Sequence, residues 1–261
     1  MVALRHTMVL TPVPRPWLTD ALAVLLDLAE DTRTEAGRVL LPDGREVPDV
    51  RHAEGRHLRP GAVYESTGGG EPGETGRITV EEWNRRRALR LALAVSAPEG
   101  AFALRCSLHR PNRPRLLEID GRARVENVWS ALSRVSGGAR LRCDDWWAAA
   151  DTGRTGRTAP LRARLECGAA RADLRAVPEP GGLDGHWAVT VTVGLRGRRL
   201  LRPVAAVALH LFRGHLQRSL ATTLDELAAE WNDTVPGLVA MGPDALRREI
   251  LTAEGAGGAR P

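Results

Sequence analysis

The residue types that could hold a metal ion come closest together in the segment RHAEGRH. It contains His52, Glu54 and His57, and imidazole and carboxylate groups are common zinc ligands. No third histidine, cysteine or further carboxylate stands at a spacing typical of a zinc site, and the segment has the composition of a loop. We therefore predict solvated side chains here and no metal site.

Catalysis by a nucleophile or an acid–base pair finds little support. The chain has no G-x-S-x-G segment, and Ser66 in YESTGGG lacks the strand-to-helix context of a nucleophilic serine. Asp144 and Asp145 are adjacent, as are Glu81 and Glu82, but neighbouring side chains of a strand point to opposite faces. No catalytic residue is predicted, and whether the protein is an enzyme stays open.

All 37 residues of the Lys and Arg class are arginines, since the sequence contains no lysine. This excludes a Walker-A loop, a pyridoxal Schiff base and a lysine general base, and no cofactor is predicted. The net charge of +5 would favour a polyanionic partner, but the arginines are spread along the chain. Only Arg85 to Arg87 and Arg196 to Arg202 form clusters, so the sequence disfavours nucleic acid as a partner.

The cellular setting is predicted from the cysteines and the apolar runs. Cys106, Cys143 and Cys167 are an odd number without a CxxC pair, which argues against a disulfide framework or a zinc ribbon. The longest apolar runs fall far short of the roughly 20 residues that span a bilayer. The N-terminus lacks the pattern of a secretory signal. We expect a cytoplasmic protein with no membrane span and make no prediction of its oligomeric state.

Alternation of apolar and polar residues predicts several strands. In the segment 187–195, Trp187, Val189 and Val191 alternate with polar or small residues, and the segments 89–95, 102–108, 161–167 and 172–176 show the same period of two. Short turns rich in glycine and proline separate them. This pattern is typical of an antiparallel sheet with one covered face and one solvated face that carries arginines.

A period of three to four residues predicts one long helix between Pro203 and Asn232. Its apolar stripe includes Leu209, Phe212, Leu216 and Leu220. Proline is tolerated in a first helical turn, and Pro236 followed by glycine should end the helix.

Shorter helices are predicted at 17–30 and 125–135, each after a strand-like run. This suggests a degenerate tandem duplication. We therefore predict three segments: an N-terminal α+β region at 1–112, which is either a degenerate copy or an extension of the sheet, a second domain at 113–235, and a partly disordered extension at 236–261.

Two stretches resemble the START-related helix-grip superfamily, which includes polyketide cyclase/dehydrase-like and Bet v 1-like proteins. They are LLEIDGRARVENVWSALSRV (116–135) and HWAVTVTVGLRGRRLLRPVAAVAL (186–209). The resemblance covers mainly the second half of the chain, and its pattern is not chemically specific. It implies an α+β fold in which a curved antiparallel sheet grips a long C-terminal helix around an apolar cavity.

The resemblance also implies which residues would line that cavity. A hydrophobic ligand, such as a lipid or a polyketide, would contact the sheet face and the helix, and an anionic group at the rim could be held by arginines. The ligand residues expected are Trp187, Val189, Val191, His210, Phe212 and Leu216, and the anion-binding residues are Arg196, Arg198 and Arg202.

Three functions are therefore compatible with the sequence. The first is binding of a hydrophobic small molecule, and the second is a cyclase or dehydratase on the same scaffold. The third is a nucleic-acid or protein-interaction module that uses the arginine-bearing face of the sheet.

Overall fold

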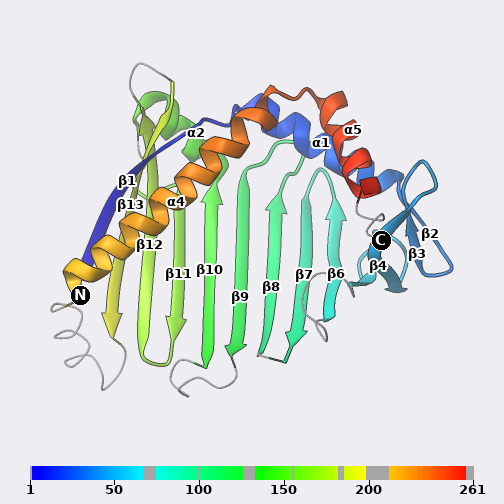
Figure 1. Cartoon of the computed structure of the whole chain (residues 1–261), viewed down its shortest axis with the longest axis horizontal. Coiled ribbons are helices and arrows are strands. Elements are labelled where there is room, and N and C mark those ends of the chain that lie inside the picture. The colour runs from blue at the N-terminus through cyan, green and yellow to red at the C-terminus, as the bar shows by residue number, and fades with distance from the viewer. Residues whose placement is uncertain are drawn as a thin grey trace. The chain divides into compact units, whose positions relative to one another are not determined.

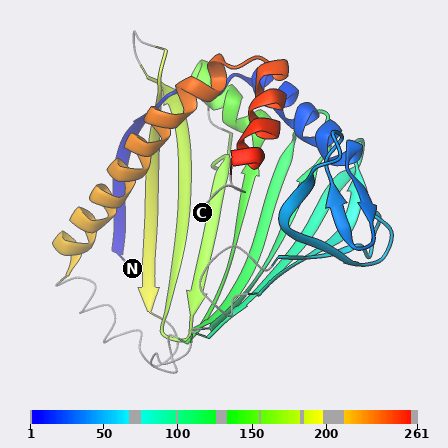
Figure 2. The same cartoon turned by 45° about the vertical axis from the view of Figure 1, so that its right-hand side comes forward.

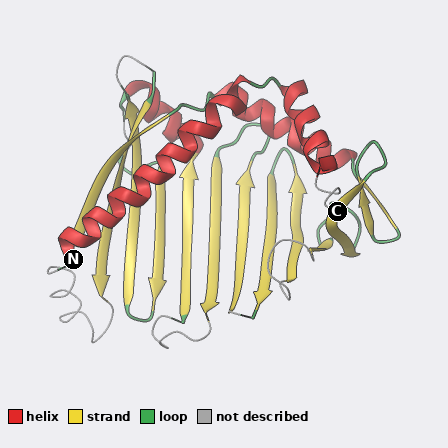
Figure 3. Ribbon diagram, in the orientation of Figure 1, coloured by secondary structure: helices red, strands yellow, loops and turns green. Residues whose placement is uncertain are grey.

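The computed structural model describes residues 2–66, 75–98, 100–125, 133–154, 156–181, 185–197 and 212–256. The chain is an α+β protein whose strands pair antiparallel with their neighbours (Figure 3). It divides into two compact units. The first unit consists of Met1–Val13 and Arg115–Gly237, and the second of Pro14–Pro114 and Leu238–Pro261. Each unit is therefore built from two separate segments of the chain.

Six described strands form the sheet of the first unit, in the order β1-β13-β12-β11-β10-β9. They are β1 (Val2–Leu10), β9 (Leu116–Val125), β10 (Arg134–Arg142), β11 (Leu161–Cys167), β12 (Ala170–Pro180) and β13 (Trp187–Gly197). Directly opposed residues share a face, and the register opposes Leu4 to Val193 and Val193 to Leu174. One face is therefore apolar. The other carries the alternate, mostly charged residues, as the period of two predicts.

Helix α4 (Arg213–Ala240) lies along the edge strand β1 (Figures 1 and 2). The side-chain amide of Gln217 accepts from the backbone N–H of Arg5 at 3.3 Å and donates to the backbone carbonyl of Arg5 at 2.7 Å. Asn232 accepts from the N–H of Thr11 at 2.7 Å and donates to the carbonyl of Val9 at 2.8 Å. These bonds satisfy backbone groups that an edge strand leaves unpaired, so α4 protects this edge from pairing with another chain.

Seven described strands form the sheet of the second unit, in the order β8-β7-β6-β5-β4-β3-β2. They are β2 (Arg33–Glu35), β3 (Arg38–Leu40), β4 (Glu46–Glu54), β5 (Val63–Ser66), β6 (Thr75–Asn84), β7 (Ala88–Ala97) and β8 (Gly100–His109). Val39, Ala62, Tyr64 and Val80 form a buried core cluster. The predicted strands at 89–95 and 102–108 are confirmed, as are those at 161–167, 172–176 and 187–195 of the first unit.

Two helices of the second unit pack against each other: α1 (Arg15–Asp31) and α5 (Pro243–Ala256). Trp17 donates its indole N–H to the carbonyl of Met241 at 3.1 Å, and Arg247 pairs with Asp31 at 2.6 Å. The prediction of a helix at 17–30 is confirmed. Within the segment 236–261, α4 continues to Ala240 and α5 covers Pro243–Ala256, packed against α1, and residues 257–261 lie outside the described part of the chain.

The bounds of the long helix differ from the prediction. Helix α4 begins at Arg213, and residues 203–211 lie outside the described part of the chain. It continues through Pro236 to Ala240. Proline removes only one helical hydrogen bond near the end of a helix, and the buried Val235 keeps this turn packed.

Two assignments from the sequence need correction. Asp144 and Asp145, treated as neighbours in a strand, lie in α2 (Cys143–Thr152), where Trp147 is buried and donates to the carbonyl of Val13 at 3.0 Å. Val135, expected at the end of a helix, lies in β10. The middle of that predicted helix, 126–132, is outside the described residues.

Candidate functional site: an arginine-lined hollow

The charged face of the sheet in the first unit, here called the arginine face, carries a row of like charges. Arg162 of β11 directly opposes Arg140 of β10 on one side and Arg175 of β12 on the other. Directly opposed residues have Cβ atoms roughly 5 Å apart, and like charges at such positions destabilise a sheet. Arg140 is compensated by Glu118 at 2.9 Å. In contrast, neither Arg162 nor Arg175 has a hydrogen bond or an ion pair with any described residue.

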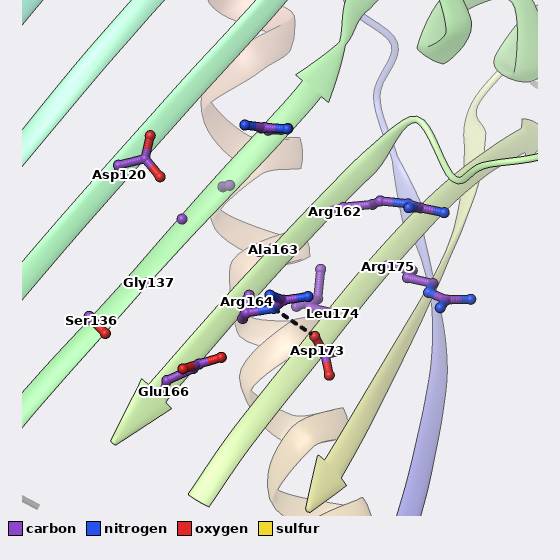
Figure 4. Close-up of a pocket in the computed structure, with 13 residues that line it drawn as sticks. Asp120, Ser136, Gly137, Arg162, Ala163, Arg164, Glu166, Asp173, Leu174 and Arg175 are labelled. Atoms are coloured by element: carbon purple, nitrogen blue, oxygen red, sulfur yellow. Dashed lines mark hydrogen bonds and ion pairs between the residues drawn. The ribbon is translucent and has the colours of Figure 1, made fainter. Parts of the chain in front are cut away.

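A hollow of about 530 Å³ opens beside this row. Gly138 lies at its floor, between the directly opposed Asp120 and Arg164. A Cβ atom at Gly138 would meet Asp120 Oδ1 at 2.6 Å, so the Asp120 carboxylate lies against this part of the strand and only glycine leaves room for it. Figure 4 shows the labelled side chains around the hollow, which come from β9, β10, β11 and β12. The lining residues are Asp120, Ser136, Gly137, Gly138, Ala139, Arg140, Arg162, Ala163, Arg164, Glu166, Asp173, Leu174 and Arg175.

Asp173, which lines the hollow, accepts hydrogen bonds from three arginines other than Arg162 and Arg175. Its carboxylate accepts from Arg171 at 2.8 Å, from Arg196 at 2.6 Å and from Arg164 at 3.1 Å (Figure 4 marks the bond to Arg164). These bonds, led by that of Arg171, hold the pKa of Asp173 well below its usual range, so the carboxylate stays ionised at neutral pH. Asp173 is therefore engaged by these three arginines and pairs with neither Arg162 nor Arg175.

The residues predicted to bind a hydrophobic ligand are only partly gathered. Trp187, Val189 and Val191 lie on the apolar face of β13 and are buried, Val189 completely. Leu216 is half-buried on α4, and Phe212 before it is 61% exposed. His210 lies outside the described residues, and this prediction stays untested.

The predicted anion-binding arginines can be followed at one position. Arg196 lies on the arginine face and is paired with Asp173. Arg198 and Arg202 fall outside the part of the chain that the structure describes.

His57 of the segment RHAEGRH belongs to a hydrogen-bonded network in the second unit. Thr32 donates its hydroxyl proton to the carbonyl of Ala29 at 2.6 Å, so its oxygen must accept from Nε2–H of His57 at 2.9 Å. Nδ1 of His57 then accepts from the hydroxyl of Tyr64 at 2.8 Å, and the Tyr64 oxygen accepts from the N–H of Leu58. Only one neutral tautomer of His57 satisfies all these bonds.

The other histidine of this segment is less well satisfied. His52 lies in β4 with its ring 5.3 Å from that of Tyr64, and its Nε2 is buried without a hydrogen-bond partner. Both histidines are half-buried, so the prediction of solvated side chains is wrong at these positions. Among the described residues, no group of three or more His, Cys, Asp or Glu side chains could hold a metal ion.

The network predicts a pH-dependent stability. Burial lowers the pKa of His57, and the nearby His52 lowers it further. The unfolded state, with a histidine pKa of about 6.5, therefore binds a proton more readily than the folded state as the pH falls. We expect the free energy of unfolding to be constant above about pH 7 and to fall below about pH 6.5, by at most about 1.4 kcal/mol per pH unit for one proton.

Urea denaturation between pH 5 and 8 measures this effect, since the denaturant midpoint reports stability. In His57→Gln the decline below pH 6.5 should be shallower than in the wild type, although the variant is less stable at pH 8. Equal slopes in the two proteins would contradict the assignment to His57.

Comparisons of the chain with protein-family models, curated protein sequences and solved structures found no match. None of the described helices is long and apolar enough to cross a membrane. The site is therefore interpreted from its own geometry.

The sequence identified the components of the arginine face but not its centre. The alternation in LRARLEC and RADLRA places Arg162, Arg164 and Arg175 on polar faces of two strands. Nothing in either segment indicates that Arg162 opposes Arg140 or that Gly138 lies beside Arg164. The GG pair at 137–138, inside a strand, is the one local signal of a close approach or a hollow.

Proposed function

We propose that the protein is a binding module whose arginine face recognises an acidic segment of a partner protein. The observation that carries this proposal is the row Arg140, Arg162 and Arg175, in which two neighbouring guanidinium groups have no ionic partner among the described residues. A carboxylate placed between them would relieve their repulsion and accept hydrogen bonds from both.

The hollow supports recognition of side chains rather than a flat electrostatic contact. It carries four arginines against Asp120, Glu166 and Asp173, so an acidic partner must place its carboxylates over the arginines and away from these three side chains. Guanidinium forks bind carboxylates in two-pronged geometry, which gives orientation as well as attraction.

The mixed charges favour a protein over a nucleic acid as the partner. A nucleic-acid backbone presents closely and regularly spaced phosphates, and the carboxylates of Asp120 and Glu166 would repel them. The lining of the hollow also has no aromatic side chain on which a base could stack. A protein segment can place acidic groups over Arg162 and Arg175 and polar or basic groups over the two carboxylates.

The earlier predictions stay open beside this proposal. Binding of a hydrophobic molecule between the apolar sheet face and α4, the helix-grip relationship, the cyclase or dehydratase activity and the cytoplasmic location are predictions from the sequence. The predicted hydrophobic ligand would lie on the apolar face of the sheet, so it does not compete with an acidic partner on the arginine face.

Fluorescence anisotropy with a labelled oligoglutamate peptide tests the proposal on the full chain. We expect the double variant Arg162→Gln/Arg175→Gln to weaken binding by about 10- to 100-fold, since a hydrogen bond to a charged group contributes about 1.5–3 kcal/mol in good geometry and less at an exposed site. Both residues are exposed and unpaired within the described chain, so the fold should be unchanged.

Arg56→Gln/Arg59→Gln is the matched control, because it removes the same number of positive charges from exposed positions of the second unit, away from the arginine face. It should bind the peptide like the wild type. Equal losses in both double variants, or no binding by the wild type, would refute a specific site on the arginine face.

A further inference from the structure

The run Arg85 to Arg87, one of the two arginine clusters of the sequence, has no role in the proposed site. It forms the turn between β6 and β7 in the second unit. Asn84 fixes this turn by accepting on Oδ1 from the backbone N–H of Arg86 at 2.9 Å and of Arg87 at 3.0 Å. The conformation of the turn is thus set by hydrogen bonds and does not depend on the arginine side chains beyond Arg85.

Arg85 anchors the turn to helix α1. Its guanidinium pairs with Asp27 at 2.6 Å and with Glu30 at 2.8 Å, and Glu30 also accepts from the indole N–H of Trp83 at 2.9 Å. The charge of Arg85 is therefore compensated within the protein, and the carboxylates of Asp27 and Glu30 are engaged by it.

The segment after β8 is joined to this turn by backbone hydrogen bonds. Arg110 donates its N–H to the carbonyl of Arg87 at 2.9 Å, and Asn112 donates to that of Arg85 at 3.2 Å. Pro111 and Pro114 are almost fully buried, and Arg110 has φ +53°, a left-handed conformation that is uncommon outside glycine. Two fixed prolines and four backbone hydrogen bonds, including Arg113 N–H to Arg110 at 2.8 Å, make this a rigid pair of turns.

This rigid pair displays a set of exposed guanidinium groups. Arg86, Arg110 and Arg113 are exposed and have no hydrogen bond or ion pair from their side chains to the described chain. Arg87 is 80% exposed and only loosely paired with Glu82, at 3.4 Å. In contrast to the hollow of the first unit, the turn segments 85–87 and 110–113 contain no Asp or Glu residue.

We infer that these paired turns bind the phosphodiester backbone of double-stranded nucleic acid without reading its sequence. Guanidinium groups match phosphate oxygens in two-pronged geometry, and a preformed display lowers the conformational entropy lost on binding. The side chains of Pro111 and Pro114 are buried, so the turns offer no apolar wedge for a lipid bilayer or a base step. A regular line of phosphates suits a cluster of cations of one sign.

Anisotropy titrations of the full chain with a labelled mixed-sequence DNA duplex at several salt concentrations test this inference. The variant Arg86→Gln/Arg110→Asn/Arg113→Gln removes the three charges, and asparagine tolerates the left-handed backbone at position 110. We expect at least a tenfold loss of affinity at low salt. The slope of log affinity against log salt should become shallower by about 2 to 3, since each phosphate contact contributes roughly 0.9.

The triple variant Arg122→Gln/Arg162→Gln/Arg175→Gln carries the same net charge and changes only the arginine face. It should keep the slope and affinity of the wild type for the duplex, whereas the turn variant should keep its binding to oligoglutamate. The inference fails if the two triple variants weaken duplex binding equally or if the wild type shows no salt-dependent binding. It also fails if the turn variant loses binding only to anionic phospholipid vesicles. Each of these results leaves the oligoglutamate test of the arginine face unaffected.

Discussion

Gly138→Val is expected to abolish measurable binding of an acidic peptide, a loss of at least about 30-fold, while the protein stays folded. The new side chain would fill the floor of the hollow. Its Cβ would stand 2.6 Å from Asp120 Oδ1 and 3.3 Å from the carbonyl of Ile119. The carboxylate is the far end of a flexible side chain and can move, and valine is well suited to a strand, so the expected change in unfolding free energy is below about 1.5 kcal/mol.

Gly194→Val provides the matched control on the same face. Gly194 opposes Asp173 from β13, and a Cβ there would meet only the Asp173 carbonyl, at an ordinary 3.8 Å. Because Gly194 does not line the hollow, this variant should bind the peptide like the wild type. Anisotropy titration and circular dichroism of both variants measure the two properties separately. Peptide binding that survives in Gly138→Val would show that the hollow is not the recognition site.

Trp187→Ala is expected to lower the free energy of unfolding by about 3–5 kcal/mol, the usual effect of deleting a large buried aromatic side chain. Trp187 is 7% exposed on the apolar face of β13, and its ring meets that of Trp146 edge-on at a centroid distance of 6.0 Å. Urea denaturation followed by circular dichroism measures the change without depending on tryptophan fluorescence.

The same experiment separates a packed core from a ligand cavity. Phe212→Ala, at a position 61% exposed and likewise predicted to contact the ligand, should change stability by no more than about 0.5 kcal/mol. If Trp187→Ala costs less than about 1 kcal/mol, the Trp187 ring borders open space. The predicted binding of a hydrophobic molecule on the apolar face would then gain support.

Local periodicity was sufficient to predict the strands that include 89–95, 102–108, 161–167, 172–176 and 187–195, because the alternation of side chains along a strand is a property of the segment itself. Trp187 to Leu195 and Leu161 to Cys167 are therefore recognisable in isolation. Asp144 and Asp145 were wrongly treated as strand residues, because the ten residues of α2 contain too few turns to establish a helical period. Helix α5 was missed because its apolar residues have α1 as their partner, which lies more than 200 positions earlier in the sequence.

In the candidate site, too, some features follow from the local sequence and others depend on residues far apart in the chain. The sequence by itself determined that the sheet has one apolar face and one face rich in arginine, and the absence of lysine excluded chemistry that needs an ammonium group. Only the tertiary structure decided which charges meet. Asp173 binds Arg196 and leaves Arg162 and Arg175 without an ionic partner among the described residues, and Gly138 lies between Asp120 and Arg164 at the hollow. The physical reason is register: cross-strand neighbours are set by how whole strands pair, and a shift of one residue would move every one of these side chains to the other face.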